Sequence, residues 1–158
     1  MLRKDIQLFL SVAGWNLYEF TEGKYRKLLV AYKGIPLISI GIYFDNKLEY
    51  DILKSSHVYI IHNNTLLIRS ERGSLTMKVM SNRSVIISIE SQTNYTKIIF
   101  RSQFRDSLIY RVNVSTFVID YDVLVMKMFI QTNSPTEDFI ITNDKAVIIK
   151  CRYSKVYL

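Results

Sequence analysis

The sequence is poor in the residues from which disulfide, metal and nucleotide sites are built. Its 158 residues include one cysteine, two histidines and five glycines. Cys151 has no second cysteine to pair with, which excludes an intrachain disulfide and favours a reducing, cytoplasmic location. The glycines are scattered and none lies in a GxGxxG or GxxxxGK pattern, which excludes nucleotide binding by those two loops. His57 and His62 stand on opposite faces of one expected strand, so we do not expect them to share a metal ion.

Long apolar runs are also absent. No segment approaches the roughly 18 apolar residues of a membrane-spanning helix, so we expect no membrane partner. Near the start of the chain, Leu2, Ile6, Phe9 and Ala13 recur at helical spacing, and Gly14 follows them as a stop. This pattern predicts an amphipathic helix over residues 2–13.

Basic residues are in excess. Lys and Arg number 21 against 14 Asp and Glu, which gives a net charge of +7. Dividing the chain at His57 gives 8 basic and 6 acidic residues before it, and 13 and 8 from it onwards, an excess of +2 and then +5. Such an imbalance points to acidic partners.

The stretch over residues 57–100 carries the clearest structural pattern. Short runs of β-branched and aromatic residues alternate with period two, and each run ends in a polar cluster. Leu75, Met77 and Val79 are expected to share one face, and Asn63-Asn64 to form a two-residue hairpin turn between strands 57–62 and 65–70. This stretch therefore predicts a strand meander.

Further strands are expected on both sides of this meander. They fall at residues 26–33, 37–44, 107–112, 115–120, 123–130, 138–142 and 145–151, while residues 45–56 suit either a short helix or a loop. We therefore predict one α+β domain over residues 1–158: an N-terminal helix with a mainly antiparallel sheet of seven to ten strands, folded as a sandwich or partial barrel. A subdivision into residues 1–56 and 57–158 stays open.

The segments FLSVAGWNLYEF and LLVAYKGIPLISIGIYF carry one resemblance. They resemble the core of Holliday-junction-resolvase-type members of the restriction-endonuclease-like superfamily, in which a helix is followed by a strand and a hairpin. The Asp, Glu and Lys of that family's hairpin fall on Leu28, Gly41 and Tyr43 of this chain, so every catalytic position is replaced. The resemblance implies a catalytically inactive relative that keeps a DNA-binding shape.

Three carboxylates form the candidate catalytic set. Asp120 and Asp122 are two residues apart, so on a strand they would project to the same side about 7 Å apart. Glu90, at the end of an apolar strand, is a candidate third member. Oxygen ligands of this kind hold Mg²⁺ or Mn²⁺, with Asp120 and Asp122 as the metal ligands, and support phosphodiester cleavage. The alternative is that all three are solvated strand ends.

Basic residues spread over successive expected strands form the candidate binding set. They are Arg69, Lys78, Arg83, Lys97, Arg101, Arg105, Arg111 and Lys127. Tyr95 and Tyr110 are interleaved with the last of them. Cations neutralise phosphates and rings stack on bases, which together favour a nucleic-acid surface, with DNA favoured over RNA. The alternative is that these cations keep half-exposed strands soluble.

Three functional hypotheses follow. The first is an intracellular protein that binds nucleic acid through a basic, aromatic-interleaved sheet face. The second is a metal-dependent nuclease or nucleotidyl-transfer-like enzyme acting on DNA. The third is a structural or inhibitory module that binds protein, or a second copy of itself, through an exposed strand edge.

Overall fold

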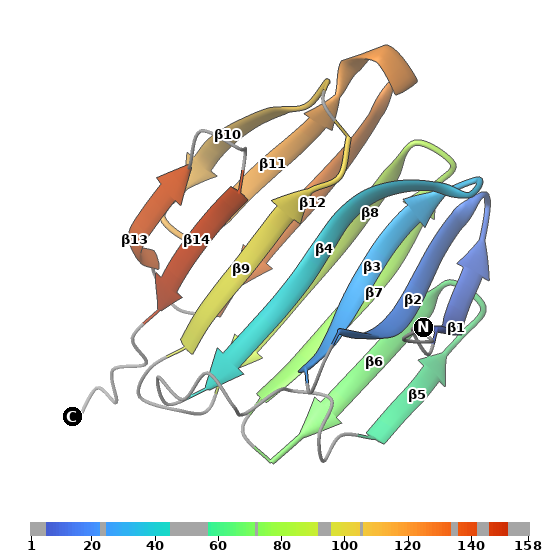
Figure 1. Ribbon diagram of the computed structural model, residues 1–158, viewed down its shortest axis with the longest axis horizontal. Helices are drawn as coiled ribbons and strands as arrows, with labels where there is room; N and C mark the ends of the chain where they lie inside the picture. Colours follow the sequence, from blue (N-terminus) through green and yellow to red (C-terminus); the bar gives the residue numbers. More distant parts are fainter. Residues whose placement is uncertain are drawn as a thin grey trace.

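The fold is a sandwich of two β-sheets (Figure 1). The computed structural model describes residues 6–22, 25–44, 57–71, 73–91, 96–104, 106–133, 136–141 and 146–151. Within these ranges the chain forms fourteen strands and one short 3₁₀ turn, η2 (Asp122–Leu124), and no α-helix. Each sheet contains seven strands.

Sheet A holds the N-terminal hairpins and three later strands. In spatial order it consists of β1 (Ile6–Val12), β2 (Trp15–Glu22), β3 (Tyr25–Tyr32), β4 (Ile35–Phe44), β9 (Thr96–Ser102), β14 (Ala146–Cys151) and β13 (Thr136–Ile141). All neighbouring strands in it are antiparallel. Because β4 pairs with β9, strands β1 to β4 lie in the same sheet as later strands, so the subdivision near residue 56 does not correspond to separate sheets.

Sheet B holds the central meander and the strands that follow it. In spatial order it consists of β10 (Leu108–Asn113), β11 (Thr116–Tyr121), β12 (Met126–Thr132), β8 (Ser84–Ser91), β7 (Gly73–Ser81), β6 (Thr65–Ser70) and β5 (His57–Ile61). β12 and β8 are parallel, and the other neighbours are antiparallel. The strands of the expected meander are thus confirmed, except that its last strand, β9, lies in sheet A.

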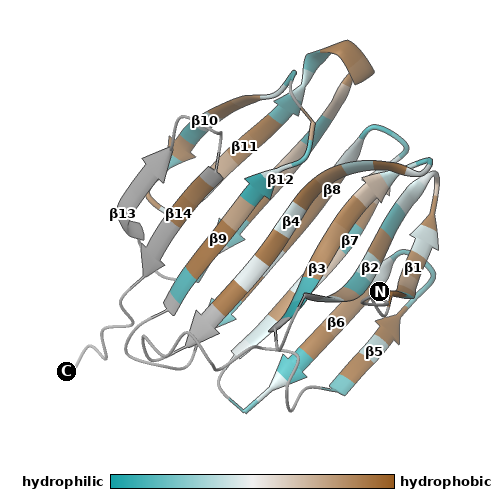
Figure 2. Cartoon of the chain, viewed as in Figure 1, coloured by the Kyte–Doolittle hydropathy of each residue, from teal (hydrophilic) through white to brown (hydrophobic). Residues whose placement is uncertain are grey.

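The core lies between the sheets and follows the period-two alternation of the strands (Figure 2). On β7 and β8 every second residue is buried, including Leu75, Met77 and Val79 as expected. Aromatic residues from both sheets meet inside: the Phe100 and Phe117 rings lie edge to face with centroids 5.3 Å apart. Burial of this apolar surface holds the two sheets together.

Two polar contacts also connect the sheets. The Trp15 indole Nε1 donates a hydrogen bond to the Ser81 carbonyl oxygen at 3.0 Å, which joins β2 to the end of β7. The Tyr121 hydroxyl lies 3.4 Å from the Leu37 carbonyl oxygen, on β4. Burial raises the pKa of the Tyr121 phenol, because the charged form would lose its hydration.

The prediction of an N-terminal helix, and with it the α+β class, is wrong. Residues 6–12 form strand β1, which pairs with β2, and the described part of the chain is nearly all strand. The segment fits two periods, because Ile6, Leu8, Leu10 and Val12 also alternate with polar or bulged positions. Ala13-Gly14 ends the strand as a hairpin turn with positive φ at both residues. The segment forms a strand and not a helix because it pairs with β2.

Smaller corrections concern turns. Between the expected strands 26–33 and 37–44, the β3–β4 turn is only Lys33-Gly34, and Pro36 lies inside β4 next to a register shift. The β5–β6 loop has three residues, since His62 has φ 61° and leaves the strand. The ambiguous residues 45–56 and the tail after Cys151 lie outside the described residues. Within the described ranges, no helix has the length and apolar character needed to cross a membrane.

Candidate functional site

Strand β4 alternates large residues with small ones. Ile38, Ile40 and Ile42 point into the core and are buried. Ser39 and Gly41 therefore lie on the outer face of sheet A, and because they are small they cover little of it. Because the neighbouring strands carry longer side chains on that face, sheet A is hollow along β4.

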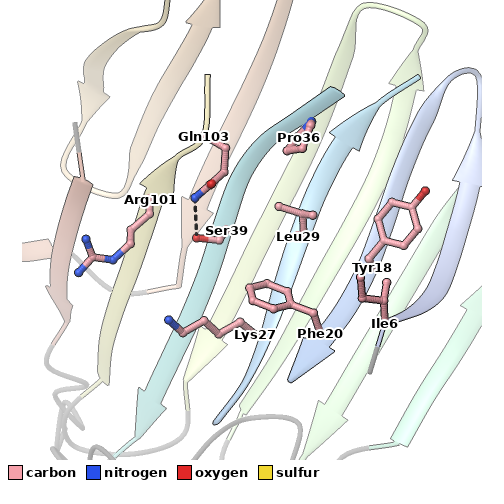
Figure 3. A pocket seen from close by; sticks show the side chains of 9 residues that line it. All are labelled: Ile6, Tyr18, Phe20, Lys27, Leu29, Pro36, Ser39, Arg101 and Gln103. Atoms are coloured by element: carbon pink, nitrogen blue, oxygen red, sulfur yellow. Dashed lines mark hydrogen bonds between the residues drawn. The ribbon is translucent and has the colours of Figure 1, made fainter. Parts of the chain in front are cut away.

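This hollow, which we call the trench, has a volume of about 660 Å³ and extends over five strands (Figure 3). Its lining residues are Ile6, Tyr18, Phe20, Lys27, Leu29, Pro36, Ser39, Arg101 and Gln103. A smaller hollow of about 70 Å³ continues it over Gly41 and Ile99. The trench is thus a surface depression with an apolar side and a polar side.

Backbone pairing sets the order of side chains across the trench. Ser39 lies between Leu29 of β3 and Arg101 of β9. One row along, Lys27 of β3 is opposite Phe20 of β2. Strands β3 and β9 are two strand spacings apart, so the backbones that carry the two cations are about 10 Å apart. Lys27 and Arg101 therefore come from the two strands that flank β4.

Two aromatic rings form the apolar side of the trench. Tyr18 and Phe20 are successive outward-facing residues of β2, and both side chains are half-buried. Figure 3 shows the rings on the β2 side, with the Lys27 chain reaching from β3 towards the Ser39 side. A flat group entering the trench would therefore meet ring surface on one side and positive charge on the other.

Ser39 is the one buried polar residue among the described residues, with 7% of its surface exposed. It lies on the floor of the trench, where the Gln103 side-chain amide donates to its hydroxyl at 3.5 Å. This hydrogen bond is at the long limit of the accepted range. A buried hydroxyl with one weak partner is suited to donate to a bound ligand.

Three cations with described side chains lie on this face. Lys27, Lys97 and Arg101 all point to the outer face of sheet A. Among the described side chains of sheet A the one carboxylate is Glu19, which faces inwards and pairs with Arg26 at 3.3 Å. The described side chains on the outer face of sheet A therefore combine cations, rings and a hydroxyl.

The predicted basic residues do not form one face. Of the eight, Lys97 and Arg101 lie on the outer face of sheet A, while Arg69, Lys78 and Lys127 lie on the outer face of sheet B. The sandwich separates these two groups, because its outer faces point in opposite directions (Figure 1).

The rest of the predicted binding set lies in turns or outside the described residues. Arg83 is in the β7–β8 turn. The Arg111 guanidinium donates to the carbonyl oxygens of Asn113 and Val114 at 3.0 and 3.1 Å, within its own hairpin. Tyr110 is exposed on β10, and Tyr95 and Arg105 lie outside the described residues. The expectation of a single basic, aromatic-interleaved face made by these residues is therefore corrected.

The structure brings together two of the three predicted catalytic carboxylates. Asp120 and Asp122 line one hollow of about 490 Å³ with Arg83 and Lys127, and Asp120 pairs with Lys127 at 3.9 Å. Both carboxylates thus lie beside cations in an open surface hollow.

Glu90 is not part of that hollow. Asp120 is opposite Lys127, which is opposite Ser84, and Glu90 lies six residues further along β8. That spacing corresponds to about 20 Å. The described residues contain no cluster of three or more His, Cys, Asp and Glu side chains able to hold a metal. The predicted three-carboxylate centre is therefore corrected, and at most the Asp120–Asp122 pair remains.

The two segments that carry the resolvase resemblance lie in strands β1 to β4 of sheet A. β3 and β4 pair as an antiparallel hairpin, with Leu28 opposite Ile40. Leu28 is buried in the core, however, and Gly41 is on the other face of the sheet. The segment matched to the helix is strand β1.

No family model, curated protein or solved structure matches this chain. Function must therefore be inferred from the site. Sequence reasoning missed Tyr18, Phe20, Lys27 and Ser39. The available signal was the alternation of Ser39 and Gly41 with isoleucines in β4, which shows a strand with one large and one small face.

Proposed function

We propose that the trench binds single-stranded nucleic acid. The observation that carries this proposal is the combination of Tyr18 and Phe20 with Lys27, Lys97 and Arg101 on one outer face of sheet A. Single-strand binding proteins use this combination, because rings stack on bases of any identity while cations follow the phosphates. The proposal includes an intracellular location, which the lone cysteine favours.

The recessed position of the rings favours unpaired bases over a duplex. Tyr18 and Phe20 are half-buried in the trench wall, so only a base turned out of a helix can lie flat against them. Ser39 at the floor can donate to a base edge or a sugar oxygen. The trench would thus hold bases while Lys27, Lys97 and Arg101 neutralise about three phosphates.

The salt dependence of binding follows from that count. For single strands, log K falls with log salt with a slope of about −0.7 per neutralised phosphate. Three contacts give a slope of about −2, which corresponds to a loss of affinity of about 20-fold between 50 and 200 mM salt.

The test is fluorescence anisotropy with a labelled single-stranded oligonucleotide over that salt range. Lys27→Gln and Arg101→Gln should each lower the affinity and reduce the slope by about 0.7. Lys78→Gln and Arg69→Gln are the matched controls, because they remove the same charge from the outer face of sheet B. Equal effects of all four variants, or no binding by the wild-type protein at low salt, would refute the proposal.

The hollow of Asp120 and Asp122 supports a second candidate, Mg²⁺- or Mn²⁺-dependent cleavage of DNA. The specific observation is that two carboxylates and two cations line one hollow. The carboxylates would hold the cation and Arg83 would contact the phosphate. Cleavage that requires Mg²⁺ or Mn²⁺, stops in EDTA and is lost in Asp120→Ala but kept in Glu90→Ala would support it. Cleavage that persists in EDTA, or no cleavage with either metal, would exclude it.

A further inference from the structure

Among the described strands, four lie at the edges of the two sheets, and only one of these four is regular. β1, β10 and β13 each contain a register shift against their neighbour, at Leu8/Leu10, Arg111/Asn113 and Thr136/Asp138. Such irregularities are a common way to prevent another strand from pairing with an edge. β5 pairs with β6 in unbroken register from His57 to Ile61, and it contains no proline and no lysine. Among the described residues, no strand lies on its other side.

After His57, the side chains of β5 are apolar, and they are exposed on both faces. Val58 and Ile60 belong to the inner face, because they pair with the buried residues Ile68 and Leu66, yet Ile60 is 64% exposed. On the outer face, Tyr59 is 48% exposed. An edge strand in water normally has one polar face, so this composition indicates a strand suited to pairing with another apolar strand.

The flank between β5 and β1 is also open. A hollow of about 370 Å³ lies there, lined by Gln7, Leu8, Phe9, Glu19, Arg26, Val58 and Ile60. The inner faces of the two sheets therefore do not close over each other at this side of the described structure. In Figure 1, β1 and β5 lie on the same flank of the molecule.

We infer that β5 pairs antiparallel with β5 of a second copy of this chain, around a two-fold axis at Tyr59. This register pairs Tyr59 with the partner's Tyr59 and Val58 with the partner's Ile60. It uses all five residues of the strand and keeps inner faces beside inner faces, whereas a shift by one residue would place inner residues beside outer ones. The result is one continuous sheet of fourteen strands across the dimer.

Two features favour a second copy over another extended segment. First, β5 carries no Asp, Glu, Lys or Arg, so it offers no charge to select a charged partner, whereas its apolar faces complement themselves. Second, β5 and β1 border the same open hollow, so a two-fold axis at β5 brings the hollows of both copies to the interface. Such an interface is closed, so it gives a dimer and not a fibre. This inference does not depend on the function of the trench.

The test measures the oligomeric state of the full chain by sedimentation equilibrium over a range of protein concentrations. The wild-type protein should be dimeric, and Ile60→Lys should weaken dimerisation by at least tenfold, because two lysines would face apolar partners across the axis. Val112→Lys is the matched control: Val112 is 58% exposed on β10, at the opposite edge of the same sheet. It should leave the dimer unchanged.

Cross-linking tests the register and does not depend on the stability of Ile60→Lys. In a Cys151→Ser background, Tyr59→Cys should form a disulfide-linked dimer under mild oxidation. Residues opposite each other in antiparallel strands have Cα atoms about 4.5–5.5 Å apart, which a disulfide can span. Val112→Cys in the same background should not be linked. A monomeric wild-type protein overturns the inference, as does a dimer that Tyr59→Cys does not link.

Discussion

The two N-terminal hairpin turns allow a controlled test of steric packing in this fold. Ala13-Gly14 and Lys33-Gly34 both have positive φ at both positions, and the Lys33 amide donates to the Gly14 carbonyl oxygen at 2.8 Å. A Cβ added at Gly14 would lie 2.8 Å from Tyr32 Cε2, whereas one added at Gly34 would meet nothing within 4 Å. The two Gly→Ala substitutions therefore share the backbone cost and differ in the clash.

The magnitudes follow from these distances. Positive φ costs a residue with a Cβ about 1–2 kcal/mol, and this applies to both substitutions. Gly14→Ala must also displace the Tyr32 ring, which packs edge to face on the buried Trp15 with centroids 5.3 Å apart. Overpacking of this kind costs about 1–3 kcal/mol. For a chain of 158 residues the extra cost lowers Tm by roughly a further 2–12 °C.

Thermal and denaturant unfolding of both variants, followed by circular dichroism, measures the difference. Repeating Gly14→Ala in a Tyr32→Leu background should reduce its penalty to that of Gly34→Ala, because the displaced ring is gone. Equal destabilisation by Gly14→Ala and Gly34→Ala, or no rescue by Tyr32→Leu, would show that the contact with Tyr32 does not set the cost.

Two other predictions concern the trench and the core. Phe20→Leu should weaken single-strand binding by at least about fivefold, since stacking on one base contributes about 1–3 kcal/mol. Phe129→Leu, on the outer face of sheet B, should leave the affinity unchanged. Equal losses of affinity in the two variants would argue against stacking in the trench. Because burial raises the pKa of the Tyr121 phenol above its ordinary 10.0, the stabilisation from keeping this group neutral is present below pH 10 and decreases as the pH rises above it. Alkaline unfolding should therefore be less steep in Tyr121→Phe, and an unchanged pH profile would show that this phenol does not contribute.

Period-two alternation was enough to predict much of the architecture before any pairing was known. On β7 and β8 the residues of one face are buried and those of the other are half-buried or exposed. The alternation fits a strand and not a helix, and it predicts both strands where the structure has them. The N-terminal segment was misread because its apolar residues satisfy the helical and the strand period together. Only the hydrogen-bonding edge of β2 decides between them.

The candidate site depends on which strands pair with each other, and the order of residues along the sequence does not show this. The trench exists because β4 pairs with β9, which places Ser39 beside Arg101 although 62 positions separate them in the chain. Lys27 joins them through the β3–β4 hairpin. In the same way, the predicted basic residues were divided between opposite outer faces once the chain crossed from sheet B to sheet A between β8 and β9. Strand alternation determines which side of a strand each residue faces, but neighbours across a sheet are determined by long-range hydrogen bonding and by burial of the core between the sheets.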